Sequence, residues 1–536
     1  MKVELLSGKH PTYAGDLWAR YDALYRGGET FDQRVHEFLP RNPDEPDAIY
    51  EARKKEAHYC GYVGPIVDWF TAKLFAAPLT IRLEEDEDDA PPSSGRIGPA
   101  SEASEPEIDP FYHEFKEDCD GAGTDLIDFM RARFTSACVK GRSWWLVEFP
   151  EANEETAPAN LRQWRESGMG RAYLTALENE QVLDWEADAR GELLWAIVHS
   201  METPRESPMT PRGRVRETWR IYDRETVTTY QREYTPGKDQ PPEDAALVGK
   251  APHLFAGVPL IAMGFVSCRS VKVKIAGRVR PIAPVELEGF WLLARLASPQ
   301  RAHFRTSSAL DWNIKRTCYA MPLFRVEDRN SPPTMGTGYY IMVGTQENAD
   351  WIAPPTGHLA MMGDRIETLK DEIYRVANQL GQSVNNNAAA VGRSGESKQA
   401  DAEASEVVLK VFGAVARDAI ERTLDLIVGG RDEPLEPCVE GLDTFNTADA
   451  ATLAPTIGQV LAMGIPSATL RRRLFQRLGE ILLPNLNEAD KHAIHEEIEA
   501  GVSAEEMLSA ARPPPGEDDK DEPATTEPAE AEGEPE

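Results

Sequence analysis

The side chains that could do chemistry in this sequence of 536 residues form no recognisable catalytic arrangement. The chain contains no phosphate-binding G-x-x-x-x-G-K-[ST] loop, no G-x-S-x-G turn, no H-E-x-x-H helix and no G-x-G-x-x-G fingerprint. His492 and His495 lie one helical turn apart, and acidic residues follow them. An exposed helix face is therefore a better interpretation than a metal site. None of the six cysteines forms a C-x-x-C pair or has a histidine at ligand spacing. We therefore expect no enzymatic activity, no cofactor and no metal ion.

Two long amphipathic patterns separated by a polar segment are the most informative feature of the chain. The first covers residues 357–382, and the second covers residues 398–430, with Ser397 as its candidate N-cap. The second helix would span roughly 45 Å at ~1.5 Å per residue, a length that organises a large assembly more often than it holds a small-molecule site. A helical hairpin in an ordinary α-rich enzyme is the alternative. The residues predicted to face inward are Met362, Ile366, Leu369, Ile373, Val376 and Leu380 in the first helix, and Val408, Val411, Val415, Ile420, Leu424 and Ile427 in the second.

The segment between these helices, residues 383–397, shows no apolar period. It contains Asn385, Asn386, Asn387 and Arg393, together with glycines that allow its backbone to flex. From the residues alone, a surface loop between two helices is the preferred interpretation.

A further helix and a small β module precede this pair. Apolar residues beginning at Leu287 predict a helix over 286–314, in which Pro299 should kink or split the chain. Residues 315–356 then contain strand-like runs at Tyr319–Val326 and Tyr339–Val343, separated by a turn-rich stretch. The order is therefore helix, small β module, helix, polar segment, very long helix.

The remaining sequence predicts an α+β fold that is mostly helical. Its N-terminal segment is α-rich up to Phe75, and short helices punctuated by prolines are expected from Thr447 to about Ala511. Another helix is expected at Asp125–Val139. The predicted strands are Leu79–Leu83, Trp144–Phe149, Gln181–Trp185, Leu193–His199 and Glu217–Tyr222.

This order of elements resembles the core of tailed-bacteriophage portal proteins: stem helix, clip, stem helix, tunnel loop and long helix. Val139–Pro150 resembles the wing segment in which a helix gives way to a buried strand, and Gly464–Leu470 resembles a helix start common in portal crowns. The resemblance implies a wing at 1–285, a first stem helix at 286–314, a clip at 315–356, a second stem helix at 357–382, a tunnel loop at 383–397, a long wing helix at 398–430, a helical crown at 431–511 and a tail at 512–536.

The same resemblance implies the function and the partners. Such a protein forms a homo-dodecameric ring at one capsid vertex and admits double-stranded DNA without sequence-specific binding. It docks the large terminase subunit and then the head-to-tail adaptor protein at its clip, and it contacts the major capsid protein through its wing. The residues implied for the DNA channel are Asn385, Asn386, Asn387 and Arg393, and those implied for docking at the clip are Arg325, Arg329, Tyr339 and Tyr340. A cytoplasmic α/β enzyme and another phage head-morphogenesis protein are the alternatives.

The charge of the chain is strongly acidic and unevenly placed. The net charge is −32, and residues 84–110 and 513–536 each hold ten acids and one basic residue, a net of −9 apiece. Both segments are predicted to be disordered because they have little apolar surface to bury. An acidic body argues against a tight grip on DNA, which needs clustered cations, but not against a channel through which DNA slides.

Two basic clusters stand out against this background. Lys272, Lys274, Arg278 and Arg280 alternate along the sequence and are predicted to share one strand face, which is solvent or a subunit contact. Arg471–Arg473 is predicted to be a solvated helix face.

No signal peptide opens the chain and no stretch of about eighteen apolar residues is present, so we expect neither export nor a membrane span. The expected location is the portal vertex of a virion, after synthesis in the cytoplasm of a bacterial host.

Overall fold

The computed structural model describes two units, Met1–Phe445 and Asn446–Glu536, of which the second contributes only Phe475 and Ile494. The predicted crown beyond 445, apart from these two residues, the tail, and residues 86–109 of the acidic insert therefore lie outside the described residues, and the fold below is that of the first unit. The residues described are 1–76, 79–85, 110–150, 162–163, 168–204, 209, 213–266, 269–275, 278–317, 321–325, 348–352, 357–377, 395–442, 445, 475 and 494.

Short helices build the N-terminal part of this unit, as the sequence predicts, and a further helix follows the acidic insert. They are α1 (Val3–Leu6), α2 (Gly15–Arg26), α3 (Gly28–Asp32), α4 (Val35–Phe38), α5 (Asp47–Glu56), α6 (Val63–Leu74) and α7 (Pro110–Glu117). Helix α6 is the most apolar of the longer helices among these, and its buried side chains join the main hydrophobic core.

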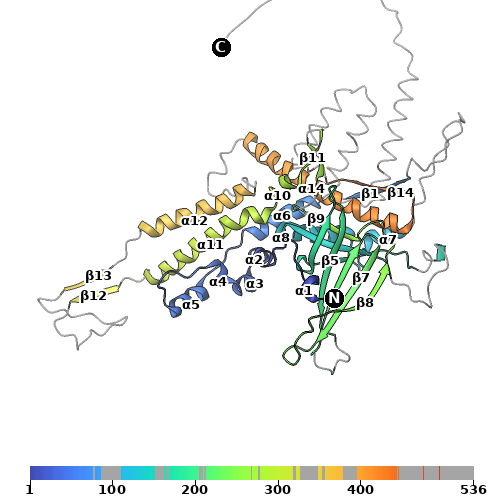
Figure 1. The fold of residues 1–536 in the computed structure, drawn as a ribbon. Helices are drawn as coiled ribbons and strands as arrows, with labels where there is room; N and C mark the ends of the chain where they lie inside the picture. Colours follow the sequence, from blue (N-terminus) through green and yellow to red (C-terminus); the bar gives the residue numbers. More distant parts are fainter. Residues whose placement is uncertain are drawn as a thin grey trace, which may run out of the picture. The chain divides into compact units, whose positions relative to one another are not determined.

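A five-stranded antiparallel sheet forms one part of the β structure (Figure 1). The predicted strands at 181–185, 193–199 and 217–222 are confirmed as three of its members. The last two strands were not predicted, because one is half-buried along most of its length and the other is exposed throughout, so neither shows an apolar alternation. In order the strands are β4 (Val182–Ala187), β5 (Leu193–Glu202), β6 (Val215–Asp223), β7 (Thr226–Tyr234) and β8 (Ala246–Pro252).

A three-stranded sheet has its central strand buried on both faces. Helix α8 (Leu126–Lys140) leads into β2 (Arg142–Glu148), which pairs with β3 (Tyr173–Leu177) and β9 (Leu260–Gly264). The carboxylate of Asp125 caps α8 by accepting from the N–H of Ile127 at 2.7 Å. Gly141 ends the helix with φ 82°, where a Cβ would lie 2.9 Å from the ring of Trp291. The predicted helix 125–139 and strand 144–149 are confirmed to within two residues.

The long helix α14 (Gly395–Arg431) is the centre of the hydrophobic core. All six residues predicted to face inward are buried. The helix contacts α6, α8, β2, β9, β10 (Val271–Ile275) and β14 (Leu435–Glu440), and β14 pairs with β1 (Thr80–Glu85). The predicted N-cap is wrong, since the helix already includes Ser397.

A pair of helices joined by a hairpin follows the predicted order (Figure 1). The predicted split at Pro299 is wrong, because α11 (Leu292–Thr317) continues through that residue. The break lies earlier, after the short helix α10 (Pro284–Glu288). Burial of Leu296 and Phe304 on either side of Pro299 offsets the roughly 3 kcal/mol that an interior proline costs. The hairpin pairs β12 (Met321–Arg325) with β13 (Asn348–Ile352) and leads to α12 (Gly357–Val376).

The basic cluster at 272–280 forms a second hairpin, from β10 and β11 (Arg278–Ile282). The register places Arg280 opposite Val273, and Lys274 opposite Val279. Because directly opposed residues share a face, the two lysines lie on one face and the two arginines on the other. The prediction that all four share one face is therefore wrong.

Two glycines of α14 give a matched test of how tightly this helix is packed. A Cβ on Gly413 would overlap the carbonyl oxygen of Leu442 and lie 2.7 Å from its carbonyl carbon, whereas a Cβ on Gly429 would meet nothing within 4 Å. We expect Gly413→Ala to lower the free energy of unfolding by about 1–3 kcal/mol or more. Gly429→Ala should raise it by about 0.5–1 kcal/mol. Chemical denaturation measures both, and equal effects would contradict the packing described.

Candidate functional site

The α11–α12 pair is the first candidate because it corresponds to the predicted stem. Helix α12 buries Leu369 and Ile373, while Met362, Ile366 and Val376 of the predicted stripe are half-buried. The outer face of α12 is exposed and carries both signs of charge. Its exposed charged residues are Asp364, Arg365, Glu367, Asp371, Glu372 and Arg375.

Buried polar side chains fix α11 to the N-terminal helices. The amide of Gln300, fully buried, donates to the carbonyl oxygen of Cys60 at 2.8 Å and accepts from the N–H of Tyr62 at 3.2 Å. The imidazole of His303 lies edge-on to Tyr62, with ring centroids 5.0 Å apart. Burial lowers the pKa of His303 and outweighs Glu367, whose charge raises it. The lowered pKa favours the neutral imidazole ring. These contacts hold α11 at a fixed position on the body of the unit.

The sequence-predicted site residues fall almost entirely outside the described part of the chain. Arg325 ends β12, where it is paired in register with Asn348. The other clip and tunnel-loop residues, and the predicted strand at 339–343, are outside the described residues, so the structure neither brings them together nor separates them. These are Arg329, Tyr339, Tyr340, Asn385, Asn386, Asn387 and Arg393.

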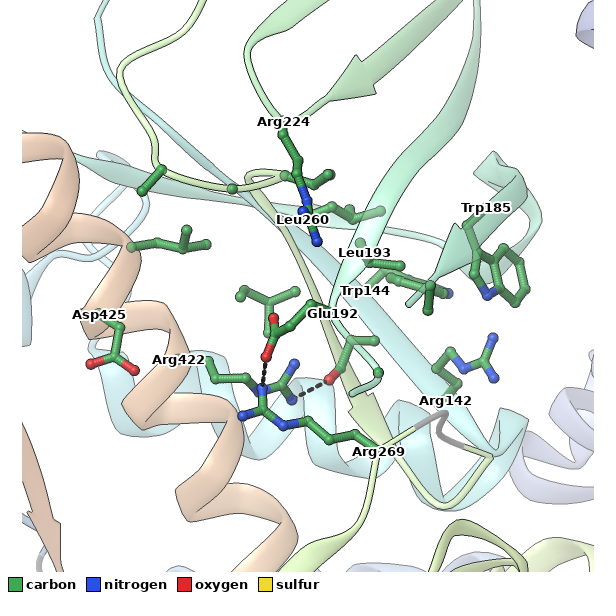
Figure 2. A pocket seen from close by; sticks show the side chains of 18 residues that line it. Arg142, Trp144, Trp185, Glu192, Leu193, Arg224, Leu260, Arg269, Arg422 and Asp425 are labelled. Atoms are coloured by element: carbon green, nitrogen blue, oxygen red, sulfur yellow. Dashed lines mark hydrogen bonds and ion pairs between the residues drawn. The ribbon is translucent and has the colours of Figure 1, made fainter. Parts of the chain in front are cut away.

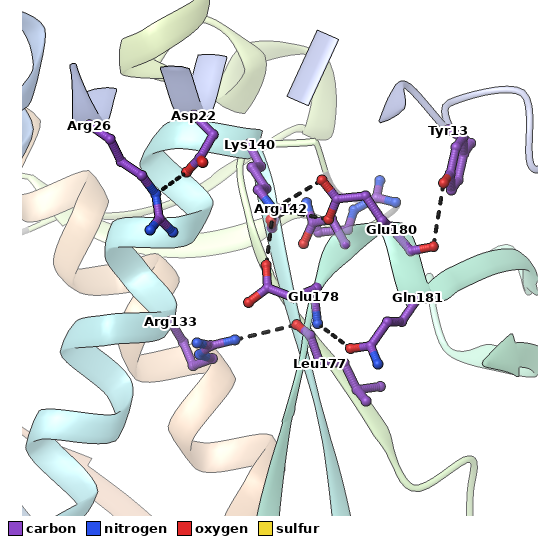
Figure 3. A network of polar contacts seen from close by, with 11 residues as sticks. Tyr13, Asp22, Arg26, Arg133, Lys140, Arg142, Leu177, Glu178, Glu180 and Gln181 are labelled. Atoms are coloured by element: carbon purple, nitrogen blue, oxygen red, sulfur yellow. Dashed lines mark hydrogen bonds and ion pairs between the residues drawn. The ribbon is translucent and has the colours of Figure 1, made fainter. Parts of the chain in front are cut away.

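A polar network joins α8 to the short 3-10 helix Asn179–Gln181 between the two sheets (Figure 3). The ammonium of Lys140 donates to Glu178 at 3.0 Å and to Glu180 at 2.9 Å. The amide of Asn179 donates to the carbonyl oxygen of Arg142 at 2.6 Å. Burial lowers the pKa of Lys140, but the hydrogen bonds and charges of Glu180 and Glu178 together raise it above its ordinary value. The network fixes the connection from β3 to β4 and hence the angle between the sheets.

A cavity of about 320 Å³ lies where the two sheets meet α14, and sequence reasoning did not identify it (Figure 2). Four arginines and two acids line it, among apolar walls that include Trp144 and Leu260. Its residues come from places spread between 142 and 426, so no local spacing could have revealed it. The charged lining residues are Arg142, Arg224, Arg269, Arg422, Glu192 and Asp425.

The part of the chain that the structure describes contains neither a candidate metal site nor a candidate membrane-spanning helix. No group of three or more His, Cys, Asp or Glu side chains there could hold a metal ion. No helix among the described residues is long and apolar enough to cross a membrane.

Comparison with known proteins yields little that bears on function. No family model matches the chain, and no curated protein matches it. One similar solved structure is a chain in the neck of an empty GTA particle computed with C6 symmetry. The two chains are 13% identical, the match covers 77% of this chain and 90% of that chain, and the TM-score is 0.39. A TM-score this low does not establish a shared fold, and the function is therefore argued from this chain's own elements.

The Lys140 network predicts a stability difference that depends on pH. Burial raises the pKa of Glu178, but the hydrogen bond and charge of Lys140 outweigh it and hold that pKa below the ordinary 4.5. The stabilisation is therefore fully present above about pH 4.5 and is lost as the pH falls through the lowered pKa. Glu178→Gln should lower the melting temperature at neutral pH, and its difference from the wild type should shrink in acid.

The matched control is Glu202→Gln, since Glu202 is exposed and makes no ion pair within the described residues. The melting temperatures of the wild type, Glu178→Gln and Glu202→Gln would be measured from neutral to acid pH. A Glu178→Gln difference that stays constant with pH would contradict the assignment.

Proposed function

We propose that the protein is a phage portal protein, the ring at one capsid vertex through which DNA is packaged and ejected. The order of elements is the observation that carries the proposal. The chain contains, in this order, helix α11, the β12–β13 hairpin, helix α12, residues 378–394 and the 37-residue helix α14. A portal has the same order of stem, clip, stem, tunnel loop and long helix.

The charge of the chain supports a channel rather than a DNA-binding groove. The exposed face of α12 holds four acids and two arginines and so offers no row of cations to retain phosphates. A mixed wall of this kind lets DNA slide, while a strongly basic wall would hold it. In this proposal Asn385, Asn386, Asn387 and Arg393 line the narrowest part of the channel and make weak, exchangeable contacts with phosphates.

The partners follow from the same assignment. Twelve copies would form the ring, and the large terminase subunit and then the head-to-tail adaptor protein would dock at residues 315–356. Arg325, Arg329, Tyr339 and Tyr340 are the proposed docking residues, and the major capsid protein would contact the wing. The protein would act in the virion.

Enzymatic activity is disfavoured by the chemistry of the cavity. A concave pocket with mutually hydrogen-bonded ionisable groups would support an enzyme, and the cavity contains one such pair, Arg269 and Glu192. However, the lining offers only the carboxylates of Glu192 and Asp425 as proton carriers, and none of its residues is Ser, Thr, Cys, His, Lys or Tyr. We therefore propose that this protein catalyses no reaction.

The proposal predicts a closed homo-oligomer. Purified full-length protein should give a mass of many subunits at micromolar concentration, because a portal ring is a closed assembly of identical subunits. Mass photometry and analytical ultracentrifugation in several buffers would measure this. A monomer in every buffer would count against a portal.

A second prediction tests the tunnel-loop assignment in the infecting particle. Replacing Asn385, Asn386 and Asn387 together by Lys should leave the ring intact but reduce packaged or retained DNA, because three cations would hold phosphates as they pass. The triple replacement by Ser keeps small polar side chains and serves as the control. Normal DNA content with the Lys variant would show that the segment does not face DNA.

A further inference from the structure

The β10–β11 hairpin concentrates positive charge on a chain whose net charge is −32. The two strands and their turn contain four cations and no acid, so the other residues of the chain sum to −36. Arg280 donates to Glu286 at 3.0 Å. Lys272, Lys274 and Arg278 are exposed and form no ion pair within the part of the chain that the structure describes. These three cations are therefore available to an acidic partner.

The inner face of the hairpin anchors it to the body of the unit. Val271, Val273 and Ile282 are buried and belong to the main hydrophobic cluster, and strand β10 contacts α14. A two-stranded hairpin is marginally stable at best in water, so this packing is what holds the ribbon in place. The position of the hairpin backbone is therefore set before any partner binds.

The outer face of the hairpin combines positive charge with apolar surface. The register places Lys272 opposite Pro281 and Lys274 opposite Val279, and all four side chains are exposed. Val279 is 66% exposed, and Val285 of the following helix α10 is 81% exposed. A site for DNA phosphates would need a row of cations and would gain nothing from exposed valines. Apolar side chains among polar ones are instead typical of a contact between proteins.

We propose that the outer face of the β10–β11 hairpin binds an acidic surface of a second copy of this chain. Charge complementarity selects this occupant, because the hairpin is basic while the rest of every copy is strongly acidic. A two-fold contact between hairpins would bring the lysines of two copies together, and like charges repel. The contact is therefore heterologous: the hairpin of one copy meets a different surface of the next, an arrangement that closes into a ring.

The inference rests on the proposed function, for which it names one contact surface between neighbouring subunits. Its test reverses the charge of the hairpin in the full-length protein. Lys272→Glu with Lys274→Glu should raise the concentration needed for half-assembly at least about tenfold, because attraction to an acidic surface becomes repulsion. The matched control is Lys238→Glu with Lys250→Glu, which makes the same change of charge at two exposed lysines of the β7–β8 hairpin. Analytical ultracentrifugation over a range of concentrations measures the assembly of each protein.

A second pair of variants tests the apolar part of the outer face. Val279→Ser should also weaken assembly, because it removes apolar surface that the neighbouring copy would cover. Val248→Ser is the matched control, since Val248 is a valine of strand β8 that is 61% exposed. Binding of a short DNA duplex by the wild type and the charge-reversed variant would be measured alongside.

Mixing the proteins separates a lost contact from a misfolded variant. The charge-reversed variant keeps its acidic surface, so the hairpin of a wild-type copy can still bind it, but its own hairpin cannot bind the next copy. An excess of this variant should therefore stop the growth of wild-type assemblies and lower their mass. An unfolded protein would not have this effect.

The outcomes distinguish this inference from the proposed function. A charge-reversed variant that assembles like its control, or that leaves wild-type assembly unchanged in the mixture, would overturn the inference while the ring stands. Loss of DNA binding with unchanged assembly would assign the hairpin to DNA instead. Small open oligomers that the charge reversal separates would support the contact and contradict the ring, whereas a wild-type monomer at every concentration would overturn both.

Discussion

The burial of α14 is the constraint on which the rest of the unit depends. Residues 411–416 of this helix are buried without a break, so it is enclosed on all sides there rather than laid on a surface. Gly413 allows the backbone at Leu442 to approach closely. At the far end the guanidinium of Arg431 lies 4.3 Å from the ring centroid of Phe111 and donates to the carbonyl oxygen of Gly170 at 2.5 Å. Helices and strands from distant parts of the chain, namely α6, α8, β2, β9, β10 and β14, all contact this one element.

The main hydrophobic cluster joins this helix to the three-stranded sheet and to the helix pair. One hydrophobic cluster contains Trp145 of β2, Leu296 of α11, Ile373 of α12 and Phe412 of α14. A displacement of the helix pair would therefore disturb the packing around α14 and the central strand of the small sheet. In a portal, such a connection would transmit force between the channel and the wing.

Sequence reasoning succeeded where burial leaves a periodic trace and failed where it does not. The inward stripe of α14 and the α8–β2 junction were predictable, because a capped helix and a run of buried aromatic residues are local signals. Strands β7 and β8 were missed since their exposure does not alternate. Pro299 suggested a break that packing overrides, while the actual break after Glu288 carries a weaker signal. The residues that line the cavity are brought together only by the tertiary fold. The same is true of Lys140 and its partners.

A cryo-electron microscopy reconstruction of the purified full-length protein tests the central claim most directly. The account predicts a closed ring with a central channel, in which the α11–α12 pair of each subunit lies beside the channel, the β12–β13 hairpins gather at one end, and α14 is enclosed within each subunit. A monomer or an open assembly, or a ring in which the α11–α12 pairs lie on the outer rim away from the channel, would contradict it.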